Sequence, residues 1–327
     1  MYKIAVVGAT GLVGQKMLEV LERKAIPFDS LTLFTSARSA GKEVEYQGKT
    51  YITEELTEEK ANEKYDFVLM SAGGSTSLKF SPIFEEAGSV VIDNSSAFRM
   101  VEDIDLIVPE VNAPKLERRI IANPNCSTIQ SVVPLKPLQE QFGLKRVAYT
   151  TYQAVSGSGV AGRNDLINGA KGEAPKNYPH PIYNNVLPHI DDFLDTGYTK
   201  EEQKMIDETK KILGLPDLKV TATCVRVPVQ DSHSVAINVT LENPATVEAI
   251  REIFEQTEGV VLIDDVENNQ YPLAVNTTGK EEVFVGRIRE DDTLENSFHI
   301  WCTADNLLKG AALNAVQILE QIHNQNK

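Results

Sequence analysis

Residues 2–14 read YKIAVVGATGLVG and decide the fold of the amino-terminal part of the chain. The apolar run at 2–7 is typical of a buried strand, and the apolar spacing from residue 12 to about residue 24 predicts a helix. Glycines between them allow a tight turn and bring backbone N–H groups close to a pyrophosphate at the helix N-terminus. The alternative is a glycine-rich turn without a ligand. We favour a dinucleotide site, made by Gly8, Thr10, Gly11, Leu12, Val13 and Gly14.

Strand and helix patterns continue to alternate along the first third of the chain. Apolar runs at 31–34, 66–71 and 89–93 predict strands, and residues 76–87 read as a helix. This alternation predicts an α/β protein whose first domain is a Rossmann-type, doubly wound parallel sheet.

The pattern changes from about residue 147, where longer and more mixed runs begin. These runs predict a second domain of α+β type with a large mixed sheet, and they lie at 147–155, 219–229, 234–242, 282–289 and 297–304. Residues 305–322 open on Asp305, a common N-cap residue, and carry apolar side chains at helical spacing. We therefore expect one domain at 1–127, completed by a returning helix at 305–327, and a second at 128–304.

Composition narrows the class of protein. The chain has 327 residues and a net charge of −15, which argues against a nucleic-acid partner but leaves room for an anionic small molecule held by a few placed cations. No apolar run has the length of a membrane span and no basic leader precedes the first strand, so we expect a cytoplasmic protein without a membrane partner. Three cysteines are too few for a disulfide framework, and no cluster has the spacing of a metal site.

The residues after the second predicted strand indicate which nucleotide binds. An acidic residue there would favour NAD by accepting a hydrogen bond from the ribose 2′-hydroxyl, but the sequence has Arg38 between Ser36 and Ser39. A guanidinium flanked by hydroxyls suits the 2′-phosphate of NADP, whereas the plain alternative is a solvated surface charge. Gly73, in a glycine-rich turn after the next strand, supports the same site.

Cys126 lies in the stretch ANPNCSTIQ at 122–130, where an extended run gives way to a helical one. Asn125 or Ser127 is suited to cap that helix, and its positive end would stabilise a thiolate. By itself, an isolated cysteine is more often a small core residue. Arg226 and His233 follow in neighbouring extended segments, where Arg suits a carboxylate and His exchanges protons near neutral pH. For an arbitrary chain, a surface ion pair and a core histidine are the simpler interpretation.

Seven ordered segments resemble the aspartate-semialdehyde dehydrogenase family over essentially the whole chain. They are GATGLVG at 8–14, SARS at 36–39, NSSAFRM at 94–100, PNCST at 124–128, YQAVSGSG at 152–159, EEQK at 201–204 and CVRVPVQDSHS at 224–234. The resemblance implies an NADPH-linked interconversion of 4-phospho-aspartate with aspartate 4-semialdehyde and phosphate, on the pathway to lysine, methionine and threonine. It also implies that the second domain is catalytic and forms the interface of a homodimer or homotetramer.

The resemblance also implies roles for single residues. Cys126 would form the acyl thioester, His233 would act as the acid/base and Gln153 would orient the reacting group. In the reductive direction, the Cys126 thiolate attacks the acyl phosphate, NADPH reduces the thioester, and His233 handles the proton as the aldehyde leaves.

Substrate and cofactor contacts are implied in the same way. Arg226 would bind the α-carboxylate and Glu201 would face the α-amino group, although the adjacent Glu202 is equally placed by sequence. Arg99 and Lys204 would bind phosphate. The positions at the nicotinamide end of NADP are Ser156, Gly157 and Asn306.

Three other functions compete with this interpretation. An N-acetyl-γ-glutamyl-phosphate reductase or a related phosphorylating aldehyde dehydrogenase shares the plan, but an acetylated substrate has no free ammonium for Glu201. A non-catalytic, NADP-binding regulatory protein would not need both Cys126 and His233. A cysteine hydrolase leaves the turn at 8–14 unexplained. Cys224 and Cys302 lie in apolar strands, which predicts core positions.

Overall fold

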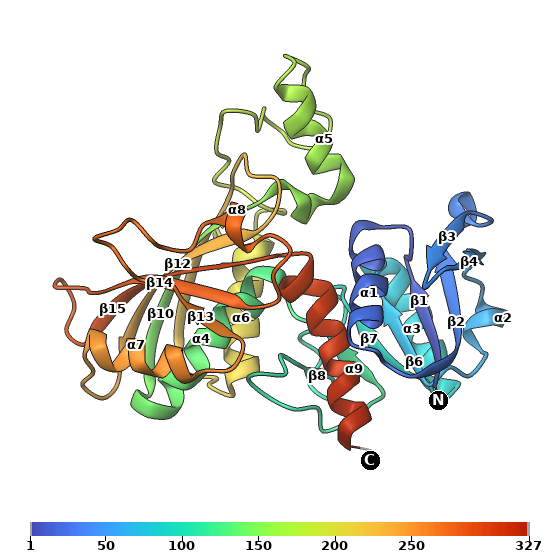
Figure 1. The fold of residues 1–327 in the computed structure, drawn as a ribbon, viewed down its shortest axis with the longest axis horizontal. Coiled ribbons are helices and arrows are strands. Elements are labelled where there is room, and N and C mark those ends of the chain that lie inside the picture. Colours follow the sequence, from blue (N-terminus) through green and yellow to red (C-terminus); the bar gives the residue numbers. More distant parts are fainter. Residues whose placement is uncertain (1, 326–327) are drawn as a thin grey trace. The chain divides into compact units, whose positions relative to one another are not determined.

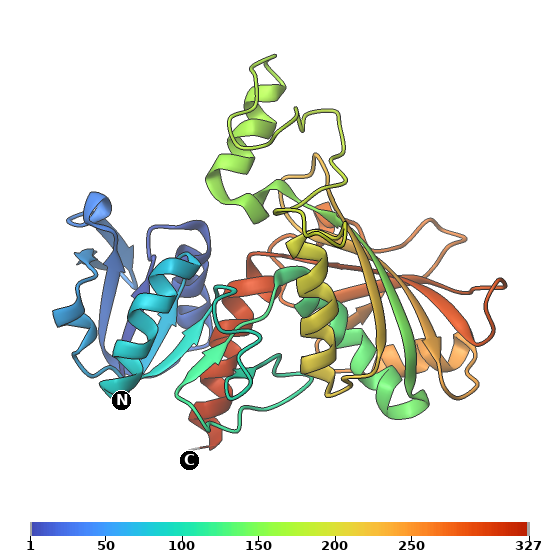
Figure 2. The same cartoon turned by 180° about the vertical axis from the view of Figure 1, so that it is seen from behind.

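The computed structural model describes residues 2–325, which divide into two units (Figures 1 and 2). The first unit contains the chain up to Pro124 together with the residues from Ala311 onwards, and the second runs from Asn125 to Gly310. The divisions thus differ slightly from the sequence-based ones after residues 127 and 304, because the helix that begins at Cys126 packs within the second unit. Residues 1, 326 and 327 of the expected first domain lie outside the described residues.

A parallel sheet forms the centre of the first unit. Its seven strands stand in the order β5-β2-β1-β6-β7-β9-β8, and every neighbouring pair is parallel. The strands are β1 (Tyr2–Val7), β2 (Phe28–Thr35), β5 (Glu54–Glu55), β6 (Phe67–Met70), β7 (Val90–Asp93), β8 (Asp105–Leu106) and β9 (Ile120–Ala122). The predicted doubly wound parallel sheet is therefore confirmed.

Helices and a small hairpin complete this unit. They are α1 (Leu12–Arg23), η1 (Ala37–Ser39), β3 (Glu43–Tyr46), β4 (Lys49–Ile52), α2 (Glu58–Ala61), α3 (Gly74–Glu86) and α9 (Leu313–Gln325). The closing helix α9 contacts α1 and β7, so the end of the chain returns to the first unit (Figure 1). Its first turn is buried on all sides, whereas the later turns bury Ile318, Leu319 and Ile322.

A six-stranded mixed sheet forms the second unit, in the order β11-β10-β12-β15-β14-β13. The pairs β10·β11 and β13·β14 are parallel and the others are antiparallel. The strands are β10 (Leu144–Gln153), β11 (Lys219–Arg226), β12 (His233–Leu241), β13 (Val260–Leu262), β14 (Val283–Glu290) and β15 (Ser297–Ala304). The mixed sheet that the sequence predicted is confirmed.

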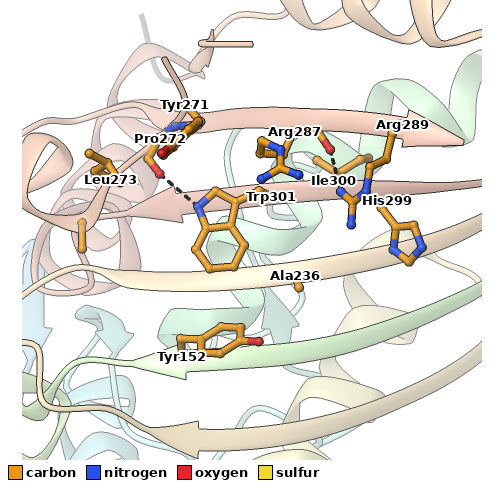
Figure 3. A pocket seen from close by; sticks show the side chains of 11 residues that line it. Tyr152, Ala236, Tyr271, Pro272, Leu273, Arg287, Arg289, His299, Ile300 and Trp301 are labelled. Carbon is orange, nitrogen blue, oxygen red and sulfur yellow. Dashed lines mark hydrogen bonds between the residues drawn. The ribbon is translucent and has the colours of Figure 1, made fainter. Parts of the chain in front are cut away.

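Three helices cover one face of this sheet. The central one, α4 (Cys126–Phe142), contacts β10, β12, β14 and β15, with α6 (Lys200–Leu213) on β11 and α7 (Val247–Gln256) on β13 and β14. The opposite face carries the short α8 (Ala274–Thr277), and Figure 3 shows the side chains that lie on it. A lobe with no counterpart in the sequence analysis, η2 (Val155–Ser158) and α5 (Gly159–Gly169), extends from the end of β10 (Figure 1).

Two elements differ from the sequence-based expectation. Strand β11 ends at Arg226 and not near residue 229, because Pro228 has no N–H to continue a ladder. The last helix begins with a π-helical turn, η3 (Leu308–Ala312), before α9. Asp305 caps this start as predicted, since its Oδ1 accepts hydrogen bonds from the N–H groups of Leu307 and Leu308 at 2.8 and 3.0 Å. Within residues 2–325, no helix combines the length and apolar composition that crossing a membrane requires.

Candidate active site

Cys126 is the first residue of α4, and the helix cap is Asn125. The Oδ1 atom of Asn125 accepts hydrogen bonds from the N–H groups of Ser127 and Thr128 at 2.9 and 3.2 Å. The first turn carries no acidic side chain, so the positive end of the helix faces the thiol without an opposing charge on its own turn. Cys126 is partly exposed. A thiol in this position is suited to react as a thiolate.

The other two cysteines have a different environment. Cys224 and Cys302 are fully buried in strands of the second unit, as their apolar surroundings predicted. Burial raises the pKa of Cys302 to about 12, and it raises the pKa of Cys224 as well. Neither thiol is therefore suited to nucleophilic chemistry near neutral pH.

Gly310, in the π-helical turn, lies directly against the nucleophile candidate. A Cβ added at Gly310 would stand 2.9 Å from the Cβ of Cys126. Real Cβ atoms do not approach so closely, so only glycine fits here without displacing Cys126. Sequence reasoning did not single out this glycine, because nothing in its local pattern shows which residue it meets.

The adjacent glutamates of the EEQK segment separate clearly in the structure. The side chain of Glu202 forms a capping box with Thr199, and its second oxygen accepts the N–H of Cys224 at 3.0 Å. Both of its oxygens are thus occupied by backbone groups. Glu201, in contrast, hydrogen-bonds to side chains that belong to the candidate site.

Glu201 joins the cap of Cys126 to Gln153. Its Oε1 accepts hydrogen bonds from Asn125 Nδ2 at 2.8 Å and from Gln153 Nε2 at 3.0 Å. Burial opposes the charge of this carboxylate, but the ammonium of Lys204 and these hydrogen bonds outweigh it and lower the pKa of Glu201. Gln153 is bonded at both ends, since its Oε1 accepts from Thr151 at 2.9 Å. Its amide therefore fixes Glu201 in place.

Lys204 stands between two carboxylates. Its Nζ lies 2.7 Å from Asp191 Oδ2 and 3.2 Å from Glu201 Oε2. Burial favours the neutral amine, yet the two carboxylates raise the pKa of Lys204 above its ordinary value.

Asp191 was not found by sequence, because it lies in an irregular segment with no motif. Glu208 was also missed; it accepts the N–H of Asn125 at 2.6 Å, and its place one heptad after Glu201 is a signal that could have revealed it.

His233 is completely buried at the start of β12. Its Nδ1 accepts the N–H of Ala154 at 3.0 Å, so the neutral ring carries its proton on Nε2. Burial, and after it the charge of Arg226, hold the pKa of His233 well below its ordinary value. Nε2 has no hydrogen-bond partner among the described residues. A buried N–H donor is thus left for a ligand.

Arg226 lies beside His233, at the end of β11. Its Nη1 donates to the carbonyl of Ala154 at 2.7 Å, and its buried Nε has no partner among the described residues. A Cβ added at Gly157 would stand 3.0 Å from Arg226 Nη1 and 3.3 Å from His233 Nε2. The two candidate side chains therefore meet at Gly157, where a side chain would fill the space between them. Ala154, which uses both its N–H and its C=O here, could not have been found by sequence.

The predicted dinucleotide turn follows β1 in the first unit. Gly8 has φ +79°, and an added Cβ would stand 2.1 Å from the carbonyl oxygen of Ser71. At Gly14 an added Cβ would stand 2.2 Å from the oxygen of Gly8. Both positions therefore require glycine, and the backbone packs as closely as the fingerprint demands.

Helix N-termini after β1, β2 and β6 offer backbone N–H groups in the same unit. The caps of α1, η1 and α3 are Gly11, Ser36 and Gly73, and none of them accepts a side-chain hydrogen bond from its helix. None of the three first turns carries an acidic residue, so nothing on them repels phosphate. Arg38 is exposed in η1. These residues fit the diphosphate and 2′-phosphate of a dinucleotide.

Arg99 is also placed in the first unit, in the turn after β7, and it is nearly buried. Its Nε donates to the carbonyl of Asn123 at 2.9 Å and its Nη2 to that of Asn94 at 3.0 Å. The turn is held by Asp93, whose carboxylate accepts from Ser77 and Ser95. Burial raises the pKa of Asp93 despite these bonds. Lys204, which the resemblance pairs with Arg99 for phosphate binding, belongs to the second unit.

Family models match both parts of the chain. The semialdehyde dehydrogenase NAD-binding domain matches residues 3–119, and the semialdehyde dehydrogenase dimerisation domain matches residues 135–309. The aspartate-semialdehyde dehydrogenase of Aquifex aeolicus is 49% identical over 98% of this chain and 97% of its own length. The chain belongs to the aspartate-semialdehyde dehydrogenase family. The predicted family resemblance is thereby confirmed.

Other aspartate-semialdehyde dehydrogenases are similar over the same extent. The Bacillus subtilis protein is 46% identical over 99% of this chain and 98% of its own length. The crystal structure of aspartate semialdehyde dehydrogenase II from Vibrio cholerae complexed with ASA has a TM-score of 0.94 at 43% identity, covering 99% of this chain and 98% of that one. The Candida albicans aspartate semialdehyde dehydrogenase with NADP has a TM-score of 0.78 at 26% identity, covering 100% and 99%. The chain therefore has a nicotinamide-nucleotide domain and a dimerisation domain of this family.

Proposed function

We propose that the protein catalyses the reversible, NADPH-dependent reductive dephosphorylation of 4-phospho-L-aspartate to L-aspartate 4-semialdehyde. The reaction would pass through an acyl thioester on Cys126, in the cytoplasm, on the pathway to lysine, methionine and threonine. One observation carries the proposal. Two buried donors, Arg226 Nε and His233 Nε2, have no hydrogen-bond partner in the part of the chain that the structure describes. They belong to side chains that meet at Gly157, and they suit an anionic substrate with a reactive carbonyl.

Arg226 and Glu201 would recognise the two charged groups of the amino acid. With Nη1 donating to the carbonyl of Ala154, the remaining edge of the Arg226 guanidinium is suited to donate two parallel hydrogen bonds to a carboxylate. Glu201 remains ionised despite its burial and would attract the α-ammonium. An N-acetylated substrate has no such ammonium, which disfavours an N-acetyl-γ-glutamyl-phosphate reductase.

Cys126 would supply the nucleophile. Its thiolate forms a bond to the carbonyl carbon of the acyl phosphate, the bond from that carbon to the phosphate oxygen breaks, and phosphate departs with the electron pair. Arg99 and Lys204 would bind this phosphate, although Lys204 must share its charge with Asp191 and Glu201. The departing phosphate takes up the proton that the overall reduction consumes.

His233 would act through Nε2. Because Nδ1 is held by the N–H of Ala154, the ring has one proton to offer, and it is directed to whatever occupies the space beside Gly157. We therefore assign to His233 the acid half of its acid/base role, in which Nε2–H donates to the oxygen on which negative charge develops. Taking up a second proton at Nδ1 would require loss of the Ala154 hydrogen bond.

NADP fits the glycine-rich turn and the three uncapped helix ends of the first unit. When bound, it would supply the hydride that reduces the thioester. Gly8, Thr10, Gly11, Leu12, Val13, Gly14 and Gly73 would hold the diphosphate, and Ser36, Arg38 and Ser39 would hold the 2′-phosphate, which is our reason to prefer NADP over NAD. Ser156, Gly157 and Asn306 would lie at the nicotinamide end.

A second copy of the chain would cover the bare face of the mixed sheet. A hollow of about 450 Å³ lies on this face. Its lining includes Tyr152, Trp301, Arg287, Arg289 and His299, whose side chains Figure 3 shows. Tyr152 is 37% exposed, although its strand β10 is paired on both sides, with β11 and β12. An aromatic and arginine-rich face is typical of protein interfaces. We propose a homodimer through this face, or a homotetramer built from such dimers.

An acyl-trapping experiment tests the proposal directly. The protein is mixed with 4-phospho-aspartate in the absence of NADPH, and intact and peptide mass spectrometry locate the adduct. We expect one aspartyl group on the peptide that contains Cys126 and none on Cys126→Ala. An adduct on Cys224 or Cys302, or the absence of any adduct in a protein that turns over, would contradict the mechanism.

A substrate panel separates the alternatives. Aspartate semialdehyde with phosphate should reduce NADP, whereas N-acetylglutamate semialdehyde should give a rate lower by at least about a hundredfold. If the wild-type protein binds NADP but reduces it with neither aldehyde, the regulatory alternative replaces this proposal.

A further inference from the structure

Ser232, the residue before His233, has a left-handed backbone. Its φ is +70°, in the region that glycine adopts without cost and other residues rarely occupy. Ser232 is also buried, with 1% of its surface exposed. A strained residue that directly precedes a buried functional side chain requires support from its surroundings.

Asn306 provides that support. Its Oδ1 accepts the N–H of Ser232 at 2.9 Å, and its Nδ2 donates to Ser156 Oγ at 3.0 Å. Asn306 is 2% exposed, and its side-chain amide is hydrogen-bonded to protein through both its oxygen and its nitrogen. A second contact, between the hydroxyls of Ser232 and Thr278 at 2.8 Å, holds the side chain of the same turn.

The two segments that Asn306 joins are the ones that orient the imidazole. Ala154, two residues before Ser156, donates its N–H to His233 Nδ1, and Ser156 N–H donates to the carbonyl of Gln230 at 3.1 Å. The segment after β10 therefore runs alongside the segment before β12, and Asn306 bridges the two beside the strained turn. If Ser232 relaxed to an extended backbone, His233 would leave its place opposite Ala154.

We propose that Asn306 is a positioning residue for His233, and that it acts by holding Ser232 in the left-handed conformation. The inference rests on the proposed function and goes beyond the sequence-based role of Asn306 as a contact of the nicotinamide. A nicotinamide contact alone would not need Ser232. If Asn306 positions His233, the loss of activity in an Asn306 variant should depend on the backbone conformation of Ser232.

Asn306→Ala and Ser232→Gly together test the proposal. Asn306→Ala should lower kcat by about 10- to 100-fold, because displacement of a catalytic group by about an ångström has effects of this size. Adding Ser232→Gly should restore at least about fivefold of kcat, because glycine holds a positive φ without the bridge. Ser232→Ala, added to Asn306→Ala, is the matched control. Like Ser232→Gly it removes the hydroxyl, but alanine keeps the strain of a positive φ, so kcat should not recover. A failure of glycine to rescue, or an equal rescue by alanine, overturns the proposal.

A measurement on the protein without substrate keeps this test separate from the reaction. Hydrogen exchange followed by mass spectrometry should show faster exchange in Asn306→Ala for peptides that contain Ala154 and Ser232, with unchanged exchange in β14 as the reference. Ser156→Ala removes the hydrogen bond from Asn306 to Ser156 but keeps the one from Ser232 to Asn306, so the same peptides should show a smaller increase in exchange. This variant replaces Asn306→Ala in the experiment if Asn306→Ala does not fold. Unchanged exchange in both variants overturns the proposal, whereas a wild-type protein that is inactive on aspartate semialdehyde refutes the proposed function alone.

Discussion

The turn after β1 and the cluster around Glu201 differ in which atoms they offer to a ligand. In the turn, Gly8 and Gly14 bring the backbone close, and the neighbouring helix ends present N–H groups without a side-chain cap. In the cluster around Glu201, charged side chains pair with one another, as the partly exposed Lys204 does with the buried Glu201 and the exposed Asp191. The turn needs positions without a side chain, so that backbone N–H groups can approach a ligand, whereas the cluster needs each of its paired side chains. A substitution in the turn should therefore act by adding atoms, and a substitution in the cluster by removing a partner.

Arg226→Leu is expected to have the largest effect, because it would remove the carboxylate contact that we propose for this buried site. We expect kcat/KM for aspartate semialdehyde to fall by about 10³-fold, mostly through KM, since truncating a buried charged contact costs about 2–5 kcal/mol. NADP binding, measured by fluorescence titration, should remain unchanged. Arg226→Lys keeps the charge without the planar fork and should recover little. A normal KM in Arg226→Leu would show that the carboxylate binds elsewhere.

Gly14→Ala should destabilise the first unit. The added methyl group would stand 2.2 Å from one backbone oxygen and 2.9 Å from Ala9 Cα, and neither can rotate away. We expect a loss of about 3 kcal/mol in the free energy of unfolding, at the upper end for overpacking. Gly73→Ala is the matched control, because nothing lies within 4 Å of its added Cβ and its φ is −69°. Its stability without cofactor should change by less than about 0.5 kcal/mol, and equal losses in both would contradict the steric argument.

Glu201→Gln should weaken the second unit in a pH-dependent way. The folded protein lowers the pKa of Glu201 below its ordinary value of 4.5, so this carboxylate stabilises the fold above that pH. Its contribution is lost as the pH falls through the folded pKa. We expect Glu201→Gln to lose about 2 kcal/mol at pH 7 in urea unfolding, with the difference from wild type shrinking below about pH 4.

Glu202→Gln is the control for helix capping on the same turn. Glu202 bonds to backbone groups of Thr199 and Cys224, whereas Glu201 pairs with the side chain of Lys204. Glu202→Gln should lower the free energy of unfolding at pH 7 through loss of its capping box. If Glu201→Gln left the free energy of unfolding at pH 7 unchanged, the Glu201 to Lys204 pair would not stabilise the fold.

Local patterns predicted the fold well, because strand and helix periodicity record which faces are buried. The run at 297–304 matches β15 to the residue, and the turn at 8–14 stands where the glycine spacing required it. What local pattern could not show were contacts between distant segments. Ala154 acts through its backbone, and Gly310 matters because it meets Cys126 across a gap of more than a hundred residues.

The candidate site shows the same division between local and distant information. The sequence indicated a helix cap at Asn125 or Ser127, and the structure has it at Asn125, whereas Asp305 caps the start of the last helix as predicted. The choice between Glu201 and Glu202 could not be made by sequence, since adjacent residues on a helix differ only in what each faces. The ring orientation of His233 likewise depends on a partner almost eighty residues away along the chain.

Arg38→Ala should have the smallest effect and probes the one charged side chain that we assign to the backbone-based cofactor site. Arg38 is exposed, so water and salt screen its attraction for a 2′-phosphate, and its loss is expected to reduce the preference for NADP over NAD by about tenfold. The ratio of kcat/KM for the two cofactors measures this, at low and high ionic strength. Lys42→Ala removes an exposed charge from the same unit and should leave the ratio unchanged. If Arg38→Ala instead abolished binding of both cofactors, the site would depend on side chains as strongly as the cluster around Glu201 does.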